Sequence, residues 1–241
     1  MALGVFEYRQ RGISIMITGQ LRYSFTAQFL RGSAIFATRA HEIERNVADS
    51  VSEDTQAEHR SYIVSAVVQC AAALESEISE VTRHGPGHHL GSNGLDTAAY
   101  VFLQPLMDVI DEQPTLDRYE LVLHLLRRPT LNRGERPYQP ADLLIKLRNE
   151  LIRYKSKWGP EMERQKLFDS LLQLRLERPP FISVHTNFFP HQCLSASLAS
   201  WCVITAGAFI NDFYAKLGVA SPLKAHEEHL VVPHPLIIGA A

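Results

Sequence analysis

Apolar residues recur every three or four positions along most of the chain, which is the spacing of a helix with one buried face. The first such stripe consists of Phe29, Ser33, Phe36, Ala40, Ile43 and Val47. A second, longer stripe consists of Ile63, Val67, Cys70, Leu74, Ile78 and Val81. It stops before Gly85 and Pro86, two residue types that commonly follow the end of a helix. The pattern therefore predicts two long helices, the second over residues 55–83.

The same spacing continues in the second half of the chain. A third stripe, after Pro140, consists of Leu144, Leu147, Leu151, Tyr154 and Trp158. It predicts a helix over residues 140–158. Further helices are expected over residues 96–111, with a kink at Pro105, and over residues 114–128, 161–177 and 195–217. We therefore predict an all-α fold, a helical bundle around two long antiparallel helices.

Composition divides the chain into three parts. Residues 1–25 form an N-terminal arm in which three isoleucines alternate with other residues around Met16, a weak signal for a strand. Two interpretations of the arm stay open: it is poorly ordered, or it reflects the choice of start site, with Met16 as the true start. Residues 26–218 are expected to form a single helical domain. Residues 219–241 contain three prolines and are expected to form a flexible tail.

Overall composition constrains function only weakly. The chain has 241 residues, is 46% hydrophobic and has a formal net charge of -2, so its total charge gives no reason to expect a polyanionic partner. Three cysteines, Cys70, Cys193 and Cys202, are an odd number in apolar surroundings, which favours a reducing compartment over a disulfide framework. No continuous apolar run reaches the roughly 20 residues of a membrane span. We therefore expect a cytoplasmic protein without a membrane association.

Basic residues are concentrated in one part of the chain. Residues 127–166 contain eleven lysines and arginines against five acidic residues. Their net charge is +6, which leaves -8 for the rest of a chain whose total is -2. Such a segment can bind a polyanion despite the nearly neutral total. The alternative is that these side chains only form the solvated face of a helix.

One motif within this segment suggests a function. The stretch LLIKLRNELIRYK at residues 143–155 resembles the signature helix of HEPN proteins, a superfamily of all-α domains that includes RNA-cutting toxins and RNA-processing nucleases. The signature is an arginine, a polar residue that is often asparagine, three more residues and a histidine, and Arg148 and Asn149 match its first two positions. Further segments resemble an uncharacterised bacterial branch of this group, at residues 58–80, 116–123, 134–158 and 187–201. The resemblance implies an RNA-associated protein that acts as a homodimer, with an antitoxin-like protein as a possible partner.

The chain departs from the signature at its histidine, where it has Arg153. In HEPN nucleases this histidine is thought to assist attack of the ribose 2′-hydroxyl on its phosphate, with the arginine orienting that phosphate. Arginine stays protonated at physiological pH and cannot act as the general base. We therefore expect a degenerate or weak ribonuclease of toxin or defence type, which would need no metal or cofactor. Its expected catalytic-site residues are Arg148, Asn149 and Arg153, and its expected RNA-binding residues are Lys146, Arg148, Arg153, Lys155 and Lys157.

Two other functions stay open: a metal-independent endoribonuclease with a different base, and a helical interaction or scaffold protein that binds no nucleic acid.

Three other groups of residues suggest chemistry less strongly. His84, His88 and His89 lie in a glycine-rich loop but match no standard metal-site spacing, so we predict no metal. Arg118 and His124 have a similar arginine-to-histidine spacing, but apolar neighbours favour a core or half-buried histidine. His191 and Cys193 precede a helix, where packing is favoured over a nucleophilic cysteine.

Overall fold

The structure is a computed structural model that describes residues 3–10, 13–20, 24–46, 51–83, 95–153 and 166–233. The described chain is helical except for one hairpin, which confirms the predicted all-α class. The hairpin pairs strand β1 (Leu3–Gln10) with strand β2 (Ile13–Gln20) in antiparallel register, from Leu3 opposite Gln20 to Gln10 opposite Ile13. The alternating pattern in the N-terminal arm thus corresponds to β2, whereas β1 was not predicted.

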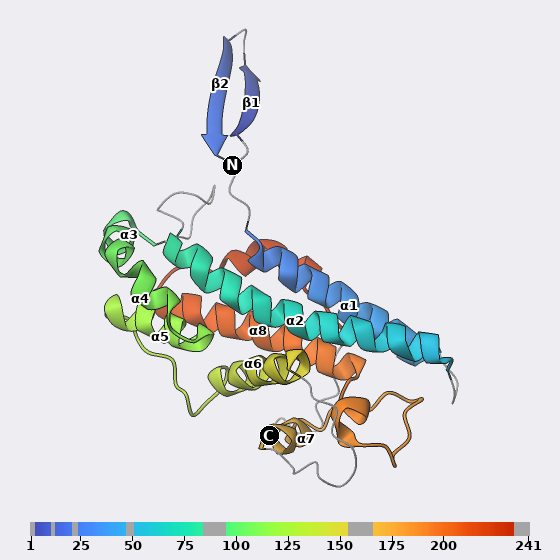
Figure 1. Cartoon of the computed structure of the whole chain (residues 1–241). Coiled ribbons are helices and arrows are strands. Elements are labelled where there is room, and N and C mark those ends of the chain that lie inside the picture. The colour runs from blue at the N-terminus through green and yellow to red at the C-terminus, as the bar shows by residue number, and fades with distance from the viewer. Residues whose placement is uncertain are drawn as a thin grey trace.

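Three long helices form the body of the molecule and lie side by side in Figure 1: α1 (Thr26–Asn46), α2 (Glu53–Arg83) and α8 (Ala196–Leu217). Each of them contacts the other two. α1 and α2 are consecutive in the chain and run in opposite directions, as Figure 1 shows. The prediction of two long antiparallel helices is therefore confirmed, and α8 is a third helix of comparable length beside them.

Shorter helical elements cover one side and both ends of these three helices. They are α3 (Thr97–Leu103), the 3₁₀ turn η1 (Gln104–Leu106), α4 (Met107–Asp111), α5 (Thr115–Leu125), α6 (Tyr138–Ile152), α7 (Lys166–Gln173), the π-helical turn η3 (Phe188–Gln192) and the 3₁₀ segment η4 (Pro222–His229). Pro105 lies in η1 and separates α3 from α4, because proline supplies no backbone N–H to a continuous helix. α6 contacts both α2 and α8, so it belongs to the same bundle, as predicted.

Local capping groups fix several helix ends. The Ser195 hydroxyl accepts a hydrogen bond from Leu198 N at 3.2 Å and begins α8. Asp96 accepts one from Ala99 N at 2.8 Å and begins α3. Gly218 ends α8 in the left-handed region, with a φ of 83° that residues with a Cβ rarely adopt. The predicted position of this last helix is therefore confirmed to within a residue at each end.

Aromatic side chains fill the core where α2, α5 and α8 meet. Tyr119 of α5 is fully buried and contacts the rings of Phe209 and Phe213 edge-on, at centroid distances of 4.9 and 4.8 Å. Its hydroxyl donates to the backbone oxygen of Leu74 in α2 at 2.7 Å. Because the polar end of the ring is satisfied inside the core, this contact fixes the distance between α5 and α2.

The buried face of α2 agrees with prediction, and that of α1 agrees in part, since Ser33 and Ala40 of the predicted stripe are fully buried. On α1 the predicted Phe29 and Phe36 are only partly buried, whereas Leu30, Ala34 and Ala37 form the core face. The face is rotated by about one residue because small side chains allow α1 to approach α2 closely. At Gly32, a Cβ atom would lie 2.3 Å from the side-chain oxygen of Gln69 on α2.

Several expected boundaries change in the structure. α5 ends at Leu125, earlier than expected, and Arg127 beyond it has a left-handed φ of 54°. α7 ends at Gln173 rather than near residue 177, and Arg175 has a φ of 51°. The expected continuation of α6 to residue 158 and the first part of the expected helix over 161–177 involve residues 154–165, which lie outside the described part of the chain.

The C-terminal segment differs from the flexible tail that we expected after residue 218. Within it, η4 contacts α1, and Leu223 is 2% exposed. The Ser221 hydroxyl accepts from Leu223 N at 3.3 Å and begins this segment. One buried leucine is enough to attach the segment to the domain, which therefore extends at least to His229. Residues 234–241 lie outside the described residues.

α8 is more apolar than we inferred from the sequence. By length and composition it could cross a membrane, contrary to our statement that no apolar run is long enough. In this structure 72% of its most apolar window is buried against the other helices. Its hydrophobicity is thus accounted for by its position in the centre of the bundle, where a helix is apolar on nearly all sides.

Candidate functional site

Arg148, the first residue of the signature motif, lies where α6 faces α2. Its Nη2 is 3.3 Å from Oε1 of Glu75, and its Nη1 donates to Oδ1 of Asn149 at 3.0 Å. The side chain is 27% exposed, so the guanidinium is held at the surface rather than within the core. Its Nε is buried and has no hydrogen-bond partner among the described residues. The structure therefore brings Arg148 and Asn149 together, and it holds the arginine through Glu75 and Asn149 while one of its donors, Nε, lacks an acceptor.

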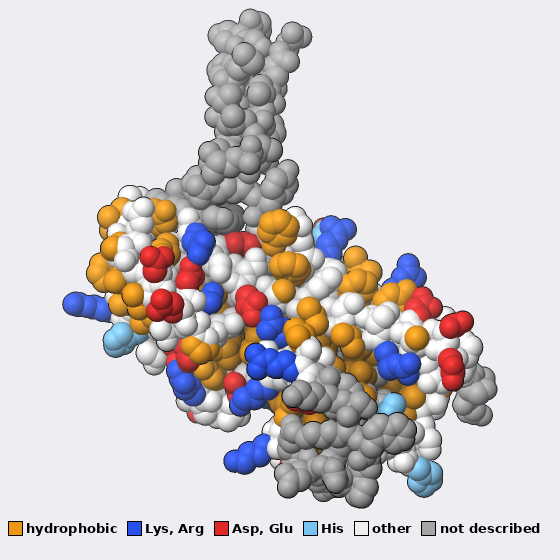
Figure 2. All heavy atoms as spheres, viewed as in Figure 1, with side chains coloured by type: hydrophobic (Ala, Val, Ile, Leu, Met, Phe, Trp, Pro, Cys, Tyr) orange, Lys and Arg blue, Asp and Glu red, His pale blue; other side chains and the backbone are white. Residues whose placement is uncertain are grey.

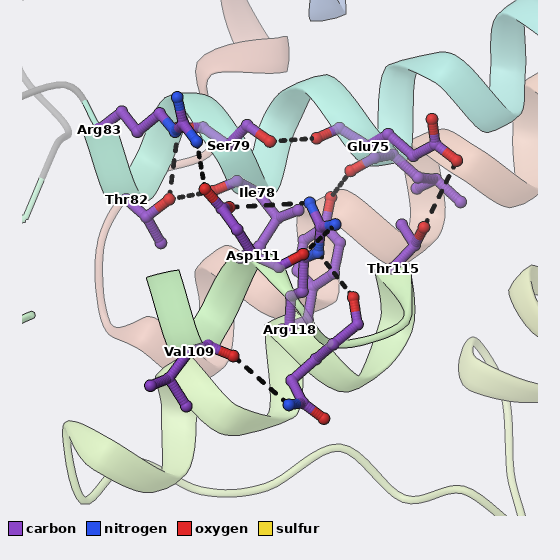
Figure 3. Close-up of polar contacts among 12 residues, drawn as sticks. Glu75, Ile78, Ser79, Thr82, Arg83, Val109, Asp111, Thr115 and Arg118 are labelled. Atoms are coloured by element: carbon purple, nitrogen blue, oxygen red, sulfur yellow. Dashed lines mark hydrogen bonds and ion pairs between the residues drawn. The ribbon is translucent and has the colours of Figure 1, made fainter. Parts of the chain in front are cut away.

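Glu75 of α2 is the residue of this site that the sequence reading missed. Besides contacting Arg148, its Oε1 accepts from the Thr115 hydroxyl of α5 at 3.5 Å, and Figure 3 shows these two side chains pointing toward each other. Glu75 thus connects α2, α5 and α6. Glu150 is the acid nearest to Arg148 in sequence, but the acid in contact with it is Glu75. The available signal was its position directly after Leu74, at the edge of the apolar stripe of the longest helix.

A neighbouring polar cluster, also drawn in Figure 3, involves Arg118 at the start of α5. Arg118 donates from Nε to the Gln113 backbone oxygen at 2.8 Å and from Nη2 to the Asp111 backbone oxygen at 2.6 Å. The carboxylate of Asp111 also pairs with Arg83 of α2. Arg118 thus holds the connection between α4 and α5, and the Asp111–Arg83 pair attaches that connection to α2.

The expectation of a core or half-buried His124 is wrong. The buried face of α5 contains Leu116, Tyr119, Val122 and Leu123, at helical spacing. His124 follows on the opposite side and is exposed. Since Arg118 is turned toward α4 and His124 toward solvent, the structure gives no support to a second arginine–histidine site on α5.

Of the other predicted RNA-binding residues, two are placed by the structure. Lys146 is exposed on α6 and pairs with Asp142 at 2.6 Å. Arg153 is exposed at the end of α6, where its backbone N–H donates to the Asn149 oxygen at 3.1 Å. The structure records no ion pair between Arg153 and any described residue. Lys155 and Lys157 lie outside the described residues.

Ion pairs reduce the net positive charge that the sequence suggested for this region. Arg133 contacts Asp117 at 2.7 Å and also pairs with Glu120, both on α5. Figure 2 shows lysines and arginines interspersed with acidic side chains over the part of this face where α5 and α6 lie. The charges of Arg133, Lys146 and Arg148 are thus each opposed by an acid, and three of the four acids involved lie on α2 and α5 rather than on α6. The face is polar and mixed rather than uniformly basic.

The burial of Cys193 argues against its acting as a nucleophile. Cys193 is 3% exposed, and burial raises the pKa of its thiol to about 12, so the reactive thiolate is disfavoured. His191 beside it is exposed. Phe189 stacks on Phe168 of α7 with a centroid distance of 4.7 Å. The predicted packing role of this segment is therefore confirmed, and all three cysteines are free thiols, as expected.

Residues 84–89, which include His84, His88 and His89, lie outside the described residues, so the structure does not test them as a metal site. Among the described residues no group of three potential metal ligands is found.

Comparison of the chain with protein-family models, with curated proteins and with solved structures found no match. The all-α fold is thus given by the structure itself, and the HEPN-like assignment depends on the sequence segments quoted above.

Proposed function

We propose that this protein is an RNA-associated, HEPN-like protein of the cytoplasm with weak or no ribonuclease activity. The observation that supports this most directly is the setting of Arg148. Its guanidinium is partly exposed, oriented by Glu75 and Asn149, and keeps one N–H without an acceptor among the described residues. An arginine positioned in this way can receive a phosphate oxygen with little loss of side-chain entropy.

The weakness of the proposed activity follows from the residues around Arg148. Arg153 occupies the position of the histidine and cannot accept a proton at physiological pH. Loss of a general base typically lowers a rate by a factor on the order of 10²–10⁴. Glu75 is the carboxylate that contacts Arg148 among the described residues, and it competes with any incoming phosphate for the guanidinium. If cleavage does occur, Glu75 is the residue placed to serve as an alternative base.

We further propose that two copies of the protein associate through the face that carries α6. At the end of this helix, Ile152 is 59% exposed and Arg153 beside it is also exposed, so an apolar side chain is available for contact next to a cation. Two such ends would bring like charges together, which is unfavourable without an intervening anion. An RNA phosphate or an acidic, antitoxin-like protein would supply that anion.

Binding of single-stranded RNA tests the proposal directly. Fluorescence anisotropy of a labelled oligonucleotide should show affinity that falls steeply between about 50 and 200 mM salt, because phosphate contacts release counterions. Arg148→Ala should weaken binding, whereas Arg31→Ala, which removes an exposed arginine from α1, should leave it unchanged. Equal losses in both variants would indicate non-specific attraction, and no retention by the wild type at low salt would contradict the proposal.

Restoring the signature tests the nuclease part separately. Arg153→His supplies a side chain that can accept a proton near neutral pH. The variant should gain metal-independent cleavage of RNA, or toxicity on expression, relative to the wild type and to an Arg153→Gln control. If the histidine variant gains nothing while RNA binding is intact, the protein binds RNA without a latent nuclease site.

The alternative function, a helical interaction protein without nucleic acid, is favoured by a different feature. Val101, Phe102 and Val109 on α3 and α4 are 58%, 51% and 54% exposed, and neighbouring large apolar side chains at a surface often mark protein contacts. The ion pairs of Lys146 and Arg148 agree with this alternative as well. It takes precedence if the wild-type protein does not bind RNA in the assay above.

A further inference from the structure

A pocket at the opposite end of α1 from its first residue is separate from the Arg148 site. It has a volume of about 550 Å³, which is large enough for a small metabolite. The end of α1 contributes His41, Glu44 and Arg45 to its wall, and the segment after α7 contributes Glu177 and Arg178. Gln192, in the turn before α8, also lines the pocket.

The acid at the back of this pocket, Glu44, is already engaged. Its Oε1 accepts from Ala196 N at the start of α8 at 2.8 Å and lies 2.8 Å from Nε2 of the buried His59. The backbone amides of Ala196 and Leu198 in the first turn of α8 are therefore satisfied by Glu44 and by the Ser195 hydroxyl. Oε1 of Glu44 is thus turned toward His59 and the start of α8.

The cations of the pocket, in contrast, are not engaged. The structure records no ion pair for Arg45 or Arg178 with any residue that it describes. Nη1 of Arg178 is buried and has no hydrogen-bond partner there. A buried donor without an acceptor is unfavourable, and arginine donors are among the most strongly polar groups of a protein. The amide nitrogen of Gln192 donates to the backbone oxygens of Val184 and Thr186, and no hydrogen bond from Nη1 of Arg178 to the side-chain oxygen of Gln192 is recorded.

We infer that this pocket binds a small molecule through a phosphate or carboxylate group, which Arg178 and Arg45 hold. An oxyanion in the pocket can bind the planar guanidinium of Arg178 through two parallel hydrogen bonds, and a rotation of this side chain toward the anion would also give its buried Nη1 an acceptor. His41 on the same wall can donate a further hydrogen bond. Glu177 is exposed at the rim, so a ligand that also carries a cationic or hydroxyl group fits the site better than a bare anion.

Thermal unfolding of the full chain with inorganic phosphate tests this inference, with acetate as the carboxylate probe and chloride at equal ionic strength as the reference. A ligand that binds only the folded state raises the unfolding temperature, by roughly 3–5 °C for each tenfold increase in its concentration above Kd in a chain of this size. The wild type should respond to phosphate, to acetate or to both, and the stronger response identifies the preferred group. No response to either would overturn the inference.

Arg178→Met distinguishes a binding residue from a structural one. In the absence of anions this variant should unfold at the same or a higher temperature, because it removes an unsatisfied buried donor, and it should lose the response to the anion. Arg148→Ala is the matched control and should keep the response. An Arg178→Met protein that is less stable yet still responds would show that Arg178 is structural. If this variant does not fold, Arg178→Lys keeps the charge and should weaken the response, and an unchanged response would overturn the inference.

A shift of the His41 ring resonances on addition of the same probes checks the location by nuclear magnetic resonance. The resonances of His124, which is exposed on α5, should not move. Shifts of similar size at both histidines would mean that the anions act on the whole surface, and the inference would then fail.

Discussion

Glu77 is an acid in the centre of the bundle, and its burial predicts an unusual dependence of stability on pH. It lies on the core face of α2 and is 3% exposed, and its Oε1 accepts a hydrogen bond from the Tyr214 hydroxyl of α8. Burial raises the pKa of this carboxyl from 4.5 to about 7, because the charged form loses its hydration. Tyr214 is buried as well, and its own burial together with the negative charge of Glu77 raises the pKa of its hydroxyl. Both side chains are therefore most stable in their neutral forms.

The size of the effect follows from the difference between the two states. In the unfolded chain the carboxyl ionises near its ordinary pKa of 4.5, whereas the folded protein keeps the proton up to about 7. The folded state thus binds more protons between these values, so the free energy of unfolding falls as the pH rises through this interval. At 1.36 kcal/mol per pKa unit the loss is about 3 kcal/mol, and little further loss from this group is expected above pH 7.

Glu77→Gln isolates the contribution that ionisation of Glu77 makes to the free energy of unfolding. Glutamine has nearly the same shape, and its side-chain oxygen can still accept from Tyr214, but it cannot ionise. At pH 8 the variant should be more stable than the wild type by up to about 3 kcal/mol. At pH 4.5 the two proteins should differ little. The control is Glu135→Gln, since Glu135 is exposed and its replacement should not change the pH profile.

Urea unfolding followed by circular dichroism, repeated at pH values from 4.5 to 8, measures the required free energies. The difference between wild type and Glu77→Gln should grow with pH and level off above 7. A variant that is less stable than the wild type at pH 8, or a difference that does not vary with pH, would refute the reasoning, since it would mean that Glu77 is ionised in the folded protein or that its carboxylate is stabilised there.

Two further predictions concern other contacts. Glu75→Gln removes the charge opposite Arg148 and should strengthen RNA binding by roughly two- to fivefold in the anisotropy assay. The expected gain is small because a half-exposed ion pair is worth about 1 kcal/mol or less. Weaker binding would instead show that Glu75 is needed to position the arginine. Leu223→Ala should destabilise the protein by about 2–4 kcal/mol in urea unfolding, because it leaves a cavity between η4 and α1. A loss below about 0.5 kcal/mol would mean that the C-terminal segment does not belong to the cooperative unit.

The sequence predicted the helices well where a long apolar stripe fixes both the element and its buried face. The stripe of α2 is the clearest example, since Ile63, Val67, Cys70, Leu74 and Ile78 are all fully buried. On α1 the same rule found Ser33 and Ala40 but also selected Phe29 and Phe36, which are only partly buried, because it favours large apolar residues. The pattern does not reveal that small residues such as Gly32 allow α2 to approach closely. Helix ends such as those after Leu125 and Gln173 depend on single backbone conformations that no periodic pattern encodes.

The polar groups of the candidate site were less predictable for a related reason. Arg148 and Asn149 were found because they are adjacent in a motif. Glu75 was missed because it is 73 residues away in sequence and only the packing of α2 against α6 brings it to Arg148. Likewise, the rule that acidic side chains are exposed gives no indication that Glu77 is buried or that Glu44 reaches the start of α8. Contacts between distant segments of this kind require the fold.

The central position of α8 has a consequence for how the chain is made. Fifteen of its 22 residues are buried, so it supplies much of the core, yet it is the last long helix to leave the ribosome. More than a hundred residues separate it from the end of α2. At usual rates of synthesis this delay lasts roughly 5–20 seconds, during which the apolar faces of α1 and α2 have no final partner. The nascent hairpin of α1 and α2 is therefore a natural client for chaperones, and a chain that stops before α8 should aggregate rather than accumulate as a smaller folded domain.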